Sequence, residues 1–163
     1  MIDFLIEAAS RDDRALLAQL RRAASRETEA AAYPIVARFF PAQANPWLEG
    51  VLVDVAVLFA EHPEQGERSL AGGLRQLADR EGSGDGVERR FVALLGAHAE
   101  DVTHHLRHAV ALLRGAEIAL DWNDLFDTLR NWGHPDRFAQ RRWARAFWSA
   151  RTDTNTEDQE ATP

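Results

Sequence analysis

The chain has 163 residues, of which 45% are hydrophobic and 28% are charged, as expected for one folded globular protein rather than a disordered or fibrous chain. It has 19 basic and 26 acidic residues, a net charge of −7, and every basic residue is arginine. The absence of cysteine excludes disulfide scaffolds, thiolate metal sites and cysteine nucleophiles. The longest apolar run, residues 55–60, is far shorter than the ~20 residues of a membrane helix, and no signal peptide is recognisable, so we expect a soluble, cytoplasmic protein.

Almost every segment has the apolar periodicity of an α-helix, and none alternates as a strand does. Ser10 and Asp13 have the spacing of a capping box, which predicts the start of a first long helix. A second helix is expected over residues 27–40, with a kink at Pro34. The chain therefore begins as a series of helices.

The next helices are predicted from their capping residues. Asn45, followed by Pro46, is typical of a helix start, and Ser69 is expected to cap a shorter helix. The segment 81–86 (EGSGDG) has three glycines in six residues, which favours a flexible linker with a possible hinge near residue 84.

The second half of the chain continues with helical periodicity. Asp121 is expected to cap one helix, and Pro135 to open the last one, which buries Trp143 and Phe147. The sequence thus predicts an all-α protein of two small helical bundles, residues 1–81 and 87–151. The acidic, polar residues 152–163 are expected to be a disordered tail.

Arginine is concentrated towards the C-terminus. Arg137, Arg141 and Arg145 recur every four residues, so they are expected to share a helix face away from Trp143. Arg107 and Arg114, seven residues apart, are also expected to share a face. Such rows present positive charges ~6 Å apart, which suits the phosphates of a nucleic-acid strand without reading its sequence. Alternatively, they are solvated surfaces that pair with nearby acids, or they meet acidic protein partners.

Three other residues have more than one interpretation. Asp54, inside an apolar stretch, is expected to be a buried or interfacial partner of an arginine. Trp47 and Trp148 are the tryptophans most expected at the surface, where a ring could stack on a base, although core packing is the more common role.

The histidines and carboxylates do not suggest an enzyme. His104 and His108 have the i, i+4 spacing that lets two imidazoles share a metal, but a helical zinc-enzyme motif needs glutamate where this chain has His105. No third ligand, paired-carboxylate motif, nucleophile elbow, P-loop or dinucleotide fingerprint is recognisable. We therefore expect no metal, no cofactor and no catalysis, with a helical metal-binding protein as a minor alternative.

Short motifs occur in a characteristic order along residues 5–148. They are L-x-x-L-R-R at 17–22, N-P-W at 45–47, S-L at 69–70, E-R-R-F at 88–91, L-R at 106–107, L-D-W at 120–122, W-G at 132–133 and R-x-x-x-x-x-W-A-R-x-F at 137–147. In this respect the chain resembles the small subunit of Cascade, the type I-E CRISPR surveillance complex, known as the CasB family. The family is often more basic where this chain has HPEQGE at 62–67.

The resemblance implies an all-α, non-catalytic subunit of an antiviral ribonucleoprotein. Two copies would contact each other, the backbone subunits on the guide RNA and the large subunit, and would hold target DNA and the displaced strand as the R-loop forms. The family's basic positions correspond to Arg21, Arg22, Arg107 and Arg137. The helix-face argument adds four candidates, which are Arg114, Arg141, Arg142 and Arg145. The alternative function is a free-standing helical adaptor for acidic protein partners.

Overall fold

The computed structural model describes residues 1–80 and 84–149, and the predicted all-α class is confirmed within them. The only strand-like pairing in these ranges is an isolated bridge between Gln65 and Leu120. The α-helices are α1 (Ile2–Ser10), α2 (Arg14–Arg22), α3 (Tyr33–Val36), α4 (Pro46–Glu61), α5 (Leu70–Arg80), α6 (Asp85–Gly96), α7 (Val102–Gly115), α8 (Trp122–Arg130) and α9 (Phe138–Trp148). Two short 3₁₀ helices, η1 (Glu29–Ala31) and η2 (Ala37–Phe39), flank α3.

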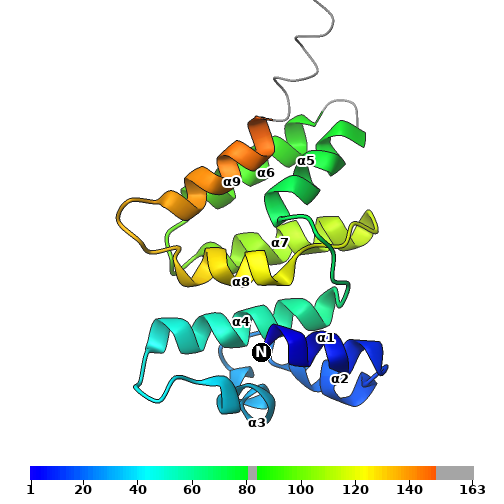
Figure 1. The fold of residues 1–163 in the computed structure, drawn as a ribbon, viewed down its shortest axis with the longest axis vertical. Helices are drawn as coiled ribbons and strands as arrows, with labels where there is room; N and C mark the ends of the chain where they lie inside the picture. Colours follow the sequence, from blue (N-terminus) through cyan, green and yellow to red (C-terminus); the bar gives the residue numbers. More distant parts are fainter. Residues whose placement is uncertain (81–83, 150–163) are drawn as a thin grey trace, which may run out of the picture.

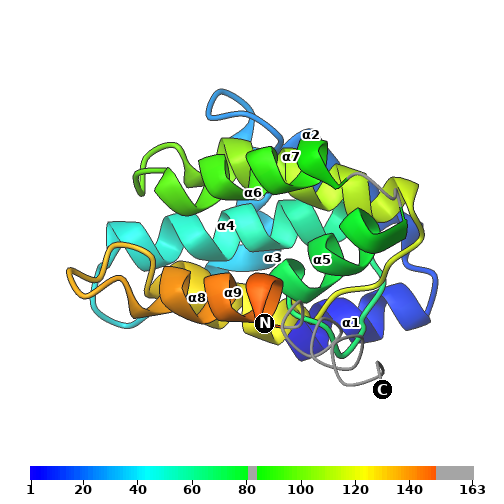
Figure 2. The ribbon, with the colours of Figure 1, turned by 90° about the horizontal axis from the view of Figure 1, so that it is seen from above.

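Helix α4 lies at the centre of the molecule. It packs against α2 and α3 on one side and against α7 and α8 on the other (Figure 1). Seen from above, α6 and α7 lie on one side of α4, and α8 and α9 on the other (Figure 2). Its side chains from Val51 to Ala60 are buried except for Asp54, because a helix covered on several sides needs apolar residues around most of its circumference. No helix in the described residues is long and apolar enough to cross a membrane.

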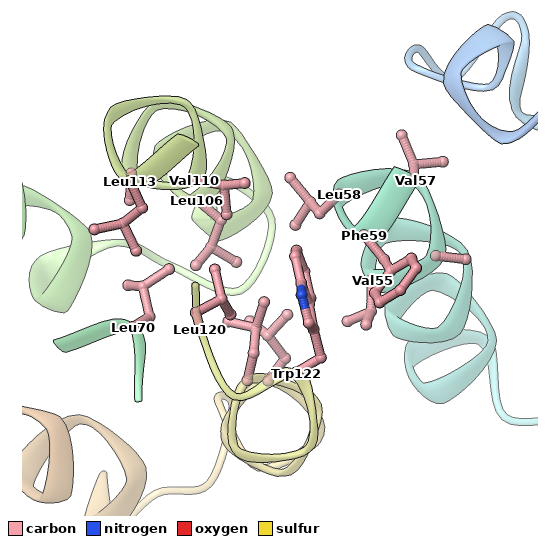
Figure 3. Close-up of a cluster of buried hydrophobic side chains, with 14 of the residues drawn as sticks. Val55, Val57, Leu58, Phe59, Leu70, Leu106, Val110, Leu113, Leu120 and Trp122 are labelled. Carbon is pink, nitrogen blue, oxygen red and sulfur yellow. The ribbon is translucent and has the colours of Figure 1, made fainter. Parts of the chain in front are cut away.

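Core side chains of several helices surround Trp122, the first residue of α8 (Figure 3). Its ring inserts between α4 and α7 (Figure 3), and its centroid lies 5.3 Å from that of Phe59. The indole Nε1 donates a hydrogen bond to the carbonyl oxygen of Glu64 at 3.2 Å, so the polar group of this buried ring is satisfied. Asp121 caps α8 as predicted, since its carboxylate accepts from the backbone N–H groups of Asn123 and Asp124.

Two predictions about the N-terminal helices are wrong: the start of one helix and the continuity of the next. Ser10 is the last residue of α1, and Asp13 alone caps α2 by accepting from Leu16 N at 3.0 Å. The helix expected over residues 27–40 is broken into η1, α3 and η2, with Pro34 in the first turn of α3. Proline lacks an N–H and has a fixed φ, so it starts a helix more readily than it continues one.

The grouping of α5 also differs from the predicted division at residues 81–87. Helix α5 packs against α6, α7 and α9, so it lies with the C-terminal helices. Gly84 has a left-handed φ of +40°, and a β-carbon there would lie 3.2 Å from that of Ala78 in α5. Gly84 therefore brings the start of α6 close to α5 in a backbone conformation that favours glycine. One continuous hydrophobic cluster joins both groups of helices. The predicted disordered tail, 152–163, lies outside the described residues.

Candidate nucleic-acid interface

The eight candidate arginines form two groups. The α2–α7 group lies at the end of α2 and on α7, and it contains Arg21, Arg22, Arg107 and Arg114. The α9 group lies at the start of α9 and along it, and it contains Arg137, Arg141, Arg142 and Arg145. Helices α2 and α9 lie towards opposite ends of the long axis of the molecule (Figure 1). The structure therefore does not gather all eight arginines into one patch.

Two arginines of the α2–α7 group bind the C-terminal end of α4. Arg21 donates from Nε to the carbonyl oxygen of Ala60 at 2.7 Å, and Arg114 donates to that of Glu61 at 3.3 Å. The last carbonyls of a helix have no partner within the helix and carry partial negative charge, so a guanidinium group stabilises them. Both side chains are exposed, and five N–H donors on each guanidinium group leave others for a ligand.

Arg107 is more deeply placed than the other members of its group. Its guanidinium group donates a hydrogen bond to the carbonyl oxygen of Ala24, just beyond α2, and its Nε is buried without a partner among the described residues. This contact joins α7 to α2. The position therefore has a packing role, whatever else the arginine does.

Arg107 also lines a cavity of about 630 Å³ with an acidic wall. The charged side chains around the cavity, histidine aside, are four carboxylates and two guanidinium groups: Glu29, Glu49, Asp54 and Glu100, with Arg26 and Arg107. Repulsion from the carboxylates makes this cavity unsuited to phosphate.

Asp54 in this cavity is held by a hydroxyl group rather than by a direct ion pair. Its Oδ2 accepts a hydrogen bond from Thr103 Oγ1 at 2.7 Å. Burial raises the pKa of the Asp54 carboxyl, and the Thr103 hydrogen bond and the charge of Arg107 oppose that shift. Arg107 thus acts on Asp54 through its charge.

In the α9 group, Arg137 lies before the helix. The helix begins at Phe138 rather than at Pro135, and Arg137 has a left-handed φ of 50°. Its backbone N–H bonds to His134 O at 2.9 Å, which closes a turn ahead of the helix. The guanidinium group donates to the carbonyl oxygen of Leu95 at the end of α6.

Arg142 faces α8 rather than solvent alone. Its guanidinium group lies 3.0 Å from the Asp124 carboxylate and also donates to Thr128 Oγ1. The same Asp124 carboxylate accepts from Trp143 Nε1 at 3.0 Å. These contacts assign Arg142 to the α8–α9 interface.

Arg141 and Arg145 are the exposed pair of α9. They lie one helical turn apart, away from the buried rings of Trp143 and Phe147. No hydrogen bond or ion pair within residues 1–80 and 84–149 involves either guanidinium group, and the same holds for Arg22 at the end of α2. The nearby acids of α8 are occupied, because Asp124 pairs with Arg142 and Asp127 with Arg130.

The histidines of α7 lie close together without forming a ligand set. The ring centroids of His104 and His108 are 4.7 Å apart. In the part of the chain that the structure describes, no group of three His, Cys, Asp or Glu side chains could hold a metal ion.

Comparison with known proteins identifies the family. The family model described as CRISPR-associated protein Cse2 matches residues 16–148. The chain belongs to the Cse2 family. This agrees with the CasB resemblance of the motifs, because solved relatives of the same fold are named CasB.

Two Cse2 relatives and one structure of a complex indicate how far the likeness extends. A CRISPR-associated protein Cse2 from Thermus thermophilus is 40% identical over 98 residues, which are 59% of this chain and 54% of that protein, so the match spans about half of its length. A crystal structure of a Cse2-family protein from Thermus thermophilus has a TM-score of 0.74 and 29% identity, covering 91% of this chain and 95% of the other. A chain from a CRISPR RNA-guided surveillance complex shares the fold of this Cse2-family chain, with a TM-score of 0.80, 24% identity and 97% of each chain covered.

Sequence reasoning missed the internal partners of these arginines and one surface ring. Arg142 and Asp124 are 18 positions apart, and no local pattern relates them. Phe138, in contrast, could have been found, because it lies outside the stripe of Ala139, Trp143 and Phe147 that the last helix buries.

Proposed function

We propose that this Cse2-family chain is the non-catalytic small subunit of a type I-E CRISPR RNA-guided surveillance complex. In that complex it holds target DNA and the displaced strand and thereby stabilises the R-loop. Its other partners are the guide-RNA-bound backbone subunits, the large subunit and a second copy of itself. Family membership supports the assignment to the complex. The exposed, unpaired row of Arg141 and Arg145 is the observation that carries nucleic-acid binding.

The geometry of this row suits a phosphate backbone. Guanidinium groups bind phosphate through planar, paired N–H donors, and neither arginine has a hydrogen bond or ion pair within the described residues that must first break. Residues one turn apart on a helix lie about 5–6 Å apart at their β-carbons, so both can reach one strand. Base pairing with the guide reads the target sequence in RNA-guided complexes, so such a subunit needs to hold only backbones.

The net charge of −7 does not oppose this function. Contact with a strand depends on the field at one face, and charges farther away than about 8 Å are screened at physiological salt. The carboxylates of the cavity come from η1, α4 and the segment before α7, whereas the row lies on α9. Arg22, at the other end of the molecule, is also exposed and has no partner within the described residues, whereas Arg107 and Arg142 have packing roles first.

The proposed role is holding rather than cutting. Three carboxylates that could act as general bases are engaged in structure: Asp124 binds Arg142 and Trp143, Asp121 caps α8, and Asp54 binds Thr103. Strand retention needs none of these groups to react. The subunit therefore contributes binding free energy to the R-loop and no chemical step.

The direct experiment assembles the surveillance complex with and without this chain and follows target-DNA release. We expect faster release without the chain, and also with the double substitution Arg141→Ala/Arg145→Ala. The matched control is Arg11→Ala/Arg14→Ala, which removes the same charge from two exposed arginines that already pair with Glu7 and Asp12. If the complex retains DNA equally well with the wild-type chain, without it and with the α9 double variant, and this variant binds an acidic subunit more weakly, the adaptor function is favoured instead.

A further inference from the structure

Two aromatic rings lie together at the surface where the α8–α9 loop enters α9. Phe138 is 43% exposed and is one of three large hydrophobic residues exposed among the described ones, with Tyr33 and Val92. The His134 side chain is also 43% exposed, and its ring centroid lies 4.9 Å from that of Phe138 at an interplanar angle of 65°. Phe138 is not among the buried and partly buried residues that form the hydrophobic core. A large part of its side chain is therefore accessible to a ligand.

The loop holds these rings in a fixed arrangement. Arg137 N bonds to His134 O at 2.9 Å, and the Arg137 side chain binds the end of α6. The buried Gln140, two residues beyond Phe138, donates to the carbonyl oxygen of Trp132 at 2.8 Å. Anchors on both sides of Phe138 reduce the entropy that a ligand would otherwise lose on ordering this loop.

The charge around Phe138 is positive. Arg137 is its neighbour in the chain, with its guanidinium group bound to the end of α6, and Arg141 lies three residues further along the helix, on the same part of the α9 surface as Phe138. Asp136 is the one carboxylate adjacent in sequence; it is 76% exposed and lies 3.8 Å from His134 Nδ1. The first turn of α9 contains no acidic residue.

Tyr33 provides the contrast within the same molecule. It is also 43% exposed, but its hydroxyl donates to Glu29 at 2.9 Å and its side chain lines the acidic cavity. Carboxylates around an exposed ring repel phosphate, whereas nearby arginines attract it. Of the two, only Phe138 combines an exposed ring with neighbouring positive charge.

We propose that Phe138, supported by His134, stacks against a base of single-stranded nucleic acid whose phosphates lie on Arg137 and Arg141. This inference rests on the proposed function and adds a base contact at Phe138, which an unpaired strand can offer and a duplex cannot. In a duplex the bases are already stacked on each other, so a surface ring gains a partner only from an unpaired base. Stacking tolerates any base, which suits a subunit that does not read sequence.

The test measures affinity of the full chain for a single-stranded oligodeoxynucleotide and for the corresponding duplex at several salt concentrations. Phe138→Leu keeps an apolar side chain and removes the ring. We expect it to weaken single-strand binding roughly 5- to 150-fold, the range for loss of one stacked base, and to leave duplex binding and the salt dependence unchanged. Phe138→Trp should retain the affinity, and Tyr33→Leu should have no effect.

Each other outcome identifies which inference fails. If Phe138→Leu binds the single strand as tightly as wild type while Arg141→Ala/Arg145→Ala binds weakly, stacking is wrong and the proposed function stands. If Phe138→Leu instead impairs only assembly with other subunits, the ring contacts protein and the proposal is overturned. If the wild-type chain binds neither strand form and leaves target-DNA retention by the complex unchanged, both inferences fail.

Discussion

Arg142 of α9 and Asp124 of α8 form an ion pair at 3.0 Å in which the carboxylate, 18% exposed, also accepts from the indole of Trp143. One carboxylate thus satisfies a guanidinium group and a buried ring N–H. The pair joins the helix of the proposed interface to the helix that packs on α4, so the two arginines 141 and 142, although adjacent in sequence, have different roles.

This relationship predicts an order of stabilities. Asp124→Ala leaves both donors without their acceptor, and we expect a loss of about 2–4 kcal/mol in the free energy of unfolding. Arg142→Ala should cost about 1 kcal/mol, because its side chain is 49% exposed and solvent weakens the pair. Arg141→Ala, which removes no hydrogen bond or ion pair within the described ranges, should cost less than about 0.5 kcal/mol. Urea denaturation measures all three, and equal values for Arg141→Ala and Arg142→Ala would contradict the assignment.

Trp143→Ala tests the continuity of the core. The Trp143 ring is fully buried, with its centroid 5.6 Å from that of Trp132, so its removal leaves a cavity. We expect a loss of about 3–5 kcal/mol in the free energy of unfolding. Because one hydrophobic cluster joins both groups of helices, thermal unfolding should remain a single transition at a lower temperature. Separate, early melting of the C-terminal helices would show that they fold independently.

Asp54→Asn tests the buried carboxyl of the acidic cavity. Burial, the dominant cause, raises the pKa of Asp54 above its ordinary value of 3.8, so at pH values above 3.8 the folded chain binds more protons than the unfolded one. Its contribution to stability is therefore full below pH 3.8 and declines as the pH rises through the raised folded pKa. Asparagine keeps an acceptor for Thr103 and does not titrate.

We expect the melting temperature of Asp54→Asn to rise relative to that of the wild type as the pH increases from about 4 to about 7. The exposed Asp3, changed to Asn, is the control, and its difference from wild type should vary less over the same range. A difference for Asp54→Asn that falls as the pH rises would mean that the Thr103 and Arg107 interactions outweigh burial.

Local signals in the sequence predicted three helix caps correctly. Asn45, Ser69 and Asp121 each accept a hydrogen bond from the first turn of their helix, because a cap depends on the next two or three residues alone. The start of α9 was misplaced because Pro135 satisfies the same local rule, and the turn at Arg137 involves a contact with Leu95, 42 residues earlier.

Pairings between distant segments could not be predicted in this way. Periodicity identifies the apolar face of α5 but not the helices that cover it, so it could not show that α5 packs against α6, α7 and α9. The candidate arginines show the same limit. Spacing placed Arg141 and Arg145 on one exposed face, but it could not distinguish them from Arg142, whose partner is on another helix.

The salt dependence of DNA retention by the assembled surveillance complex tests the central claim most directly. Each lost phosphate contact on a duplex reduces the slope of log affinity against log salt by ~0.9, so Arg141→Ala/Arg145→Ala should reduce it by about 1.8, or by about 1.4 on a single strand. The control Arg11→Ala/Arg14→Ala should leave the slope at the wild-type value. A wild-type slope for the α9 double variant, or the same reduction for both variants, would contradict a nucleic-acid contact at this row.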